Sequence, residues 1–158
     1  MRWQLTDKAL FFAPWQSILT LKAGSLEEYS LLERWGEPGQ APAALLLESF
    51  LQSARWLVEA SSSFTLSCVP LEIDYWNALP GLRPGERFCV FLRVTEHIRE
   101  RVRFALRQGH VPPGKEAPGI DIWQAPAGED GLLTCTLTPL EQWYLPRDRA
   151  CLWQEIYA

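Results

Sequence analysis

The stretch PAALLLESFLQSARWLV, residues 42–58, is apolar on most sides and yet contains a carboxylate. Glu48, Gln52, Arg55 and Glu59 recur at spacings of four, three and four residues, so a helix would place them on one face. A carboxylate beside apolar walls can act as a general acid when protonated or as a general base when ionised. On the pattern alone, Glu48 is either such a group or an ordinary polar residue facing solvent or a second subunit.

The surrounding chain predicts one helix embedded among antiparallel strands. The helix is expected over Pro42–Ala60, with Pro42 in its first turn and Ser61–Ser63 ending it. In the segment 64–76, Pro70 indicates an edge strand or a bulge. The strand-like runs are residues 15–22, 26–32, 64–76, 87–96, 99–108, 120–125 and 132–138.

These runs suggest particular hairpins and a fold class. Residues 15–22 and 26–32 are expected to pair. Residues 87–96 and 99–108 form a hairpin closed by His97-Ile98, and residues 120–125 and 132–138 form another. A helix that is apolar on most faces must be covered on most faces. A curved antiparallel sheet wrapped around it meets that need, which is the α+β hot-dog fold.

Length and composition narrow the function classes. The 158 residues indicate a single domain over 1–158, in which the tail 139–158 shows no clear period. A net charge of −4 does not favour nucleic-acid binding. No apolar run is long enough to span a membrane, and the N-terminus lacks the layout of a signal peptide. A cytoplasmic protein is therefore expected.

The cysteines and histidines argue against a metal site. The four cysteines show no C-x-x-C spacing and the chain has only two histidines, so neither a metal nor another cofactor is expected. Cys89 and Cys135 lie in strand-like runs and are expected to be buried thiols. His97 and His110 are expected in a turn and a loop.

The helix LLLESFLQSA resembles the central helix of the 3-hydroxyacyl-acyl-carrier-protein dehydratases of the FabA/FabZ type. Pro42, Leu45, Leu46, Leu47, Glu48 and Gln52 fall in register with that helix. Residues 82–94 are similar to the family's Pro-Gly-Asp strand entry, and residues 129–138 to its closing strand. The resemblance covers most of residues 11–138. It implies a hot-dog dimer in which each site combines one chain's His with the other chain's Glu.

The chain departs from that family at the catalytic loop. The family has a His fourteen residues before the Glu, and here that position holds Arg34, followed by Trp35. Because an arginine stays protonated, Arg34 cannot accept the substrate proton. Ala43 replaces a family Gly at the helix N-terminus, where its backbone N–H could still bind a thioester oxygen.

Three functions follow as hypotheses, and the first is preferred on the sequence. The chain is a dehydratase-like protein of fatty-acid or polyketide-type biosynthesis that lacks its own base, and it binds acyl thioesters or pairs with a dehydratase paralogue. Alternatively, it is an acyl thioesterase with an ionised Glu48, or a structural homodimer with a vestigial pocket. The candidate site comprises Glu48 as acid or partner in trans, Gln52 in support, and Arg34, Trp35, Ala43 and Trp56 for substrate binding.

The expected partners are an acyl carrier protein or a coenzyme A thioester, in a homodimer or a heterodimer. Seven of the fifteen basic residues are arginines between positions 83 and 107. They form either the solvated face of a hairpin or a dock for an acidic carrier protein.

Overall fold

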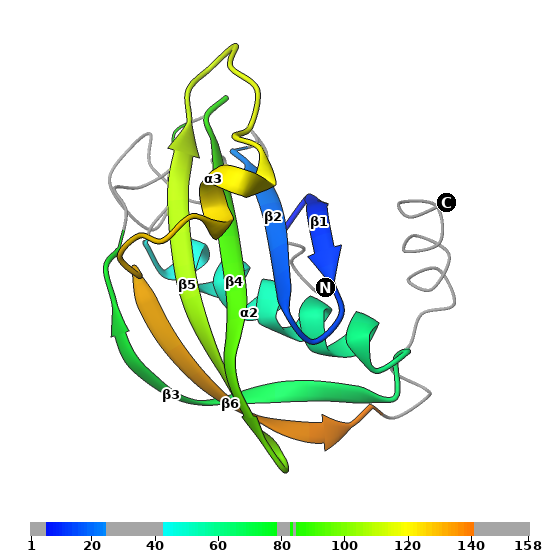
Figure 1. Cartoon of the computed structure of the whole chain (residues 1–158). Helices are drawn as coiled ribbons and strands as arrows, with labels where there is room; N and C mark the ends of the chain where they lie inside the picture. Colours follow the sequence, from blue (N-terminus) through cyan, green and yellow to red (C-terminus); the bar gives the residue numbers. More distant parts are fainter. Residues whose placement is uncertain (1–5, 25–42, 79–82, 84, 141–158) are drawn as a thin grey trace, which may run out of the picture.

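The computed structural model describes residues 6–24, 43–78, 83 and 85–140. They form a six-stranded antiparallel sheet that curves around a long helix, α2 (Figure 1). The strand order is β1-β2-β4-β5-β6-β3, so β1 and β3 lie at the edges. The elements are β1 (Lys8–Ala13), β2 (Ser17–Ala23), α2 (Ala43–Ser61), β3 (Leu66–Trp76), β4 (Arg87–Ile98), β5 (Arg101–Val111), α3 (Ile120–Gln124) and β6 (Gly131–Pro139).

Helix α2 has a leucine-rich sequence with no glycine or proline inside it, which favours an uninterrupted helix. Its apolar side is buried on the concave face of the sheet, through Leu46, Phe50, Ala54, Leu57 and Val58. Each large side chain so buried contributes about 1.5–3 kcal/mol. The predicted central helix is confirmed, shifted by one residue at each end.

The hairpin of β4 and β5 supplies the centre of the sheet. In β5, Val102, Phe104 and Leu106 are fully buried toward α2, while Arg101 and Arg103 point outward. This alternation is typical of a strand with one face on the core. The turn lies at Arg99-Glu100 rather than at the predicted His97-Ile98.

The histidines were expected outside the strands, and that expectation was wrong. His97 belongs to β4 and His110 to β5. The ring of His97 stacks on Trp15 with centroids 4.9 Å apart. His97 also pairs with Val102 of β5, so β4 continues past it instead of turning there.

Strand β3 confirms both expectations for the proline. Pro70 lies in a strand that pairs only with β6, so β3 is an edge. The register also shifts between Pro70 and Glu72, as a bulge requires. A residue without an N–H is tolerated at such a position.

The first hairpin differs from the prediction. β2 pairs with β1 and β4, and the predicted partner, residues 26–32, lies outside the described residues. β1 was missed because Asp7 and Pro14 bracket only six residues, too few for a clear alternation. Trp15 adopts a φ of 54° in the turn between the two strands.

The prediction of a strand at residues 120–125 was also wrong, because residues 120–124 form α3. Trp123 is buried against the outer face of the sheet, and the Nη1 of Arg107 donates to the carbonyls of Ile122 and Ala125 at 3.1 and 3.0 Å. Arg107 also donates to the carbonyl of Trp123. One guanidinium can reach all three carbonyls only if the chain coils, so these contacts outweigh the strand propensity of the isoleucines. Within the described residues no helix is long and apolar enough to cross a membrane.

Candidate functional site

The polar face of α2 is attached to edge strand β3. Glu59 is only 8% exposed, and its Oε1 accepts a hydrogen bond from the Oγ of Ser67 at 2.8 Å. β3 then runs back alongside the helix toward its N-terminal end (Figure 1). The face that carries Glu48 and Gln52 is therefore the face next to β3.

Glu48 and Gln52 are both half-buried, one turn apart on this face. The Nε2 of Gln52 donates to the Oε1 of Glu48 at 3.5 Å, the long limit of a hydrogen bond. The amide can thereby orient the carboxylate without neutralising it. Within the described residues, Glu48 forms no ion pair with a basic side chain.

Edge strand β3 carries several apolar side chains. Four of them are unusually exposed for their type: Val69 (48%), Leu71 (52%), Ile73 (38%) and Tyr75 (40%). No role was predicted for these four residues from the sequence. Their spacing was a usable sequence signal. Apolar residues at every second position of a predicted edge strand indicate a surface that a partner covers.

The other candidate residues are dispersed. α2 begins at Ala43, so the backbone N–H of Ala43 is among the first-turn donors without an intrahelical acceptor. Arg34 and Trp35 lie outside the described residues. Trp56 is half-buried and packs against the main core. It lies about 12 Å along the helix from Glu48 and roughly 80° around it.

Neither histidine hydrogen-bonds to Glu48 in the part of the chain that the structure describes. Trp15, on which His97 stacks, donates its backbone N–H to the Oγ of Ser61 at 2.8 Å. Ser61 ends α2, roughly 20 Å along the axis from Glu48. His97 therefore belongs to the opposite end of the helix, and His110 is exposed near the end of β5.

The thiols of Cys68 and Cys89 are held protonated. A hydrogen bond with Cys135 and burial raise the pKa of Cys68 far above its usual range. Burial raises the pKa of Cys89 to about 11. The expectation that Cys89 and Cys135 are buried thiols is confirmed, and nucleophilic chemistry at Cys68 or Cys89 is disfavoured.

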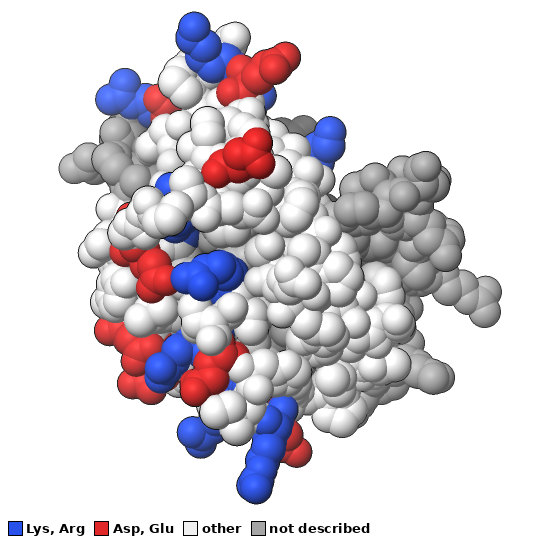
Figure 2. Space-filling model, in the orientation of Figure 1, with Lys and Arg blue, Asp and Glu red and all other residues white. Residues whose placement is uncertain are grey.

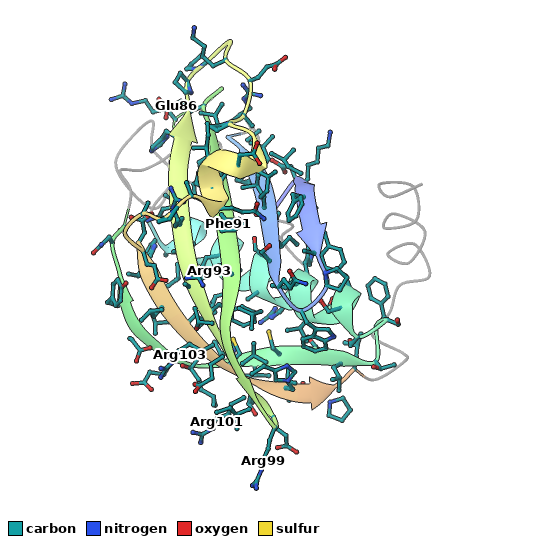
Figure 3. The ribbon with its side chains drawn as sticks, in the orientation of Figure 1. Glu86, Phe91, Arg93, Arg99, Arg101 and Arg103 are labelled. Carbon is teal, nitrogen blue, oxygen red and sulfur yellow. The ribbon has the colours of Figure 1, made fainter. Side chains whose placement is uncertain are left out.

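The arginines between positions 83 and 107 do not form an unbroken basic surface in the view of Figure 2, where acidic and basic groups alternate. Arg93 pairs with Glu129 at 3.0 Å, and Arg107 holds the backbone at α3. The solvated-face interpretation accounts for the exposed Arg99, Arg101 and Arg103 (Figure 3).

Comparison with solved structures identifies the architecture. A hot-dog-like protein from Thermanaerovibrio acidaminovorans matches with a TM-score of 0.53 and 14% identity over 91% of this chain and 93% of its own. This chain has the hot-dog fold. No protein-family model matches the sequence. A search of curated proteins finds no match either.

Two further hot-dog neighbours were solved with a coenzyme A compound. A Streptococcus mutans UA159 protein bound to acetyl CoA matches with a TM-score of 0.53 and 13% identity, covering 88% of this chain and 91% of its own. A hypothetical thioesterase with coenzyme A from Streptococcus pneumoniae TIGR4 matches with a TM-score of 0.52 and 12% identity, covering 85% and 88%. At these identities the similarity establishes the fold of this chain alone.

The polar face of α2 offers three elements of acyl chemistry. Glu48 is a carboxylate that can exchange a proton, Gln52 can orient it, and the first turn of the helix has N–H donors for a developing oxyanion. β3, the edge strand that Ser67 joins to this helix, carries exposed apolar residues.

Proposed function

We propose that this chain is an acyl-thioester hydrolase, with Glu48 as the general base. The observation that carries the proposal is the half-buried Glu48 carboxylate, oriented by Gln52 and lying on the helix face beside an exposed apolar strand. The hot-dog neighbours solved with acetyl CoA or coenzyme A support a thioester as the substrate class.

The reaction needs one base and one set of oxyanion donors. An ionised Glu48 takes a proton from water, and the water oxygen adds to the thioester carbonyl carbon. Backbone N–H groups of the first turn of α2, including that of Ala43, stabilise the oxyanion. The C–S bond then breaks, Glu48 returns its proton to the leaving thiolate, and a carboxylic acid and a thiol are released.

A dimer through β3 completes this proposal. Val69, Leu71, Ile73 and Tyr75 are exposed on an edge strand, whose unpaired backbone groups can pair with a second strand. Two copies paired along β3 would cover these side chains and bring each β3 next to the partner's helix. The thioester is carried by coenzyme A or by an acyl carrier protein.

A second candidate keeps the dehydratase resemblance. The register of Pro42, Glu48 and Gln52 favours a dehydratase-like subunit, and Arg34 in place of the family's His removes its own base. Such a chain would act in a heterodimer, with Glu48 serving as the acid opposite a paralogue's His. Trp35 and Trp56 would then contribute to the acyl pocket.

Kinetics of the purified full chain test the first candidate. We expect turnover of acyl-CoA, followed by loss of thioester absorbance, to fall on the order of 10²–10⁴-fold in Glu48→Gln. Glu96→Gln, the same change at an exposed position of β4, should leave the rate unchanged. A wild-type rate no higher than that of Glu48→Gln across a panel of acyl lengths would reject hydrolysis.

Mixing experiments test the second candidate. A catalytically complete dehydratase paralogue is combined with wild-type or Glu48→Gln chain, and mixed dimers are isolated. Dehydration at the shared site that is lost with Glu48→Gln supports the role in trans. An unchanged rate, together with no thioester hydrolysis, would leave the structural dimer with a vestigial pocket.

A further inference from the structure

The connection from β5 to β6, residues 112–130, lies over the convex face of the sheet, on the side opposite α2 (Figure 1). It has a small core of its own, in which Trp123 packs with Leu19, Cys89, Phe91 and Val111. A Cβ added to Gly109 would lie 3.2 Å from the ring of Trp123, so this glycine allows the indole to seat closely. The connection is therefore packed onto the sheet.

A cavity of about 310 Å³ lies between this connection and the sheet. Its floor consists of two cross-strand pairs of β4 and β5, namely Phe91 opposite Arg107 and Arg93 opposite Ala105. The methyl group of Ala105 leaves the room that a larger side chain would fill. Figure 3 shows Phe91 and Arg93 along β4 beneath α3. The volume matches the lower end of small-molecule pockets.

Two guanidinium groups and one carboxylate line the cavity, alongside apolar walls. Arg93 and Arg107 carry two positive charges and Glu129 one negative charge, which leaves one positive charge uncompensated at the cavity. In the described part of the chain, Arg107 donates only through Nη1, so its Nε and Nη2 remain available. Arg93 likewise uses only Nη2, toward Glu129.

The Arg93–Glu129 pair does not prevent Arg93 from binding a ligand. The two side chains are 57% and 30% exposed, and an ion pair in that setting is weak because water screens it. A guanidinium with unused donors in a fixed fork matches a carboxylate in two-point contact. Phe91, Ala105 and Pro126 provide apolar surface beside it.

We propose that this cavity is a second binding site, for a small organic monoanion with one carboxylate and a compact apolar body. The carboxylate binds between Arg93 and Arg107, and the apolar body lies against Phe91 and Ala105. The site lies on the opposite face of the sheet from Glu48 and does not depend on thioester hydrolysis.

Titration of the full chain with benzoate tests the proposal, using isothermal calorimetry and ligand-observed NMR. We expect saturable binding of benzoate and at least tenfold weaker binding of benzamide, its neutral isostere. Arg93→Gln should weaken benzoate at least tenfold because a charge-assisted bond is lost. Arg101→Gln, the same change at an exposed arginine of β5 outside the cavity, should not change the affinity.

A substitution that fills the cavity tests where the ligand binds without changing any charge. Ala105→Leu fills the cavity and should abolish benzoate binding while the far-ultraviolet circular dichroism spectrum stays native. If that variant fails to fold, Ala127→Trp at the exposed rim takes its place, with the same expectation. Absence of benzoate binding by wild type, or binding that Arg93→Gln and the steric variant leave intact, would overturn the proposal. Loss of binding in Glu48→Gln but not in Arg93→Gln would also overturn it.

Discussion

The hydroxyl of Ser67 donates to the Oε1 of Glu59 at 2.8 Å, and this bond joins the polar face of α2 to edge strand β3. Glu59 is 8% exposed, so the bond is largely shielded from water. Farther along, the same strand carries the exposed apolar side chains Val69, Leu71, Ile73 and Tyr75. The contact thus fixes how the candidate site and the candidate dimer edge lie relative to each other.

Removing this hydroxyl should destabilise the protein. Ser67→Ala deletes a shielded hydrogen bond to a carboxylate, and we expect a loss of about 1.5–3 kcal/mol in the free energy of unfolding, measured with urea. Ser63→Ala is the matched control, because Ser63 is exposed and its side chain forms no hydrogen bond within the described residues. Equal effects of the two substitutions would show that the bond to Glu59 contributes nothing.

The edge of β3 should govern assembly. We expect a dimer by sedimentation at tens of micromolar, and a monomer for Leu71→Lys, because a charge would be buried in the paired edges. Ile122→Lys makes the same kind of change at an exposed isoleucine of α3 and should leave the dimer intact. A wild-type monomer would exclude the homodimer and leave only pairing with a paralogue.

The purified chain alone should not dehydrate 3-hydroxyacyl thioesters. Arginine at the position of the family's catalytic His cannot accept the proton, and no histidine hydrogen-bonds to Glu48 in the described residues. Product formation is followed by mass spectrometry of the acyl chain. Robust dehydration that Glu48→Gln abolishes would contradict this expectation.

Stability should fall at alkaline pH because of Cys89. Burial raises its pKa from 9.0 to about 11, so the folded state retains a proton that the unfolded state releases above pH 9. The contribution is full below pH 9, and about 2–3 kcal/mol is lost between pH 9 and 11. Comparing urea unfolding of wild type and Cys89→Ala over this range isolates the effect. Parallel pH profiles for the two proteins would refute it.

The central part of the fold was predictable because its patterns are local. The apolar helix and the alternation of Val102, Phe104 and Leu106 are visible along the chain. The strand misread at Ile120–Ala125 was not predictable in this way, since α3 depends on Arg107 and Trp123 meeting across more than ten residues. Long-range contacts of this kind override local propensity.

The candidate site was only partly visible in the sequence. Glu48 and Gln52 could be paired from helical spacing, and the structure places a hydrogen bond between them. The attachment of Glu59 to Ser67 and the exposure of Leu71 depend on which strand lies at the sheet edge. Strand order is a tertiary property that spacing along the chain does not encode.

A crystal structure of the chain with a non-hydrolysable 2-oxoalkyl thioether analogue of acyl-CoA, which keeps a carbonyl, would locate the acyl-thioester site. We expect the analogue's carbonyl to lie within hydrogen-bond reach of the first turn of α2. We also expect one water between that carbonyl carbon and the Glu48 carboxylate. An analogue bound elsewhere, with Glu48 facing only solvent, would contradict the assignment of Glu48 to an acyl-thioester site.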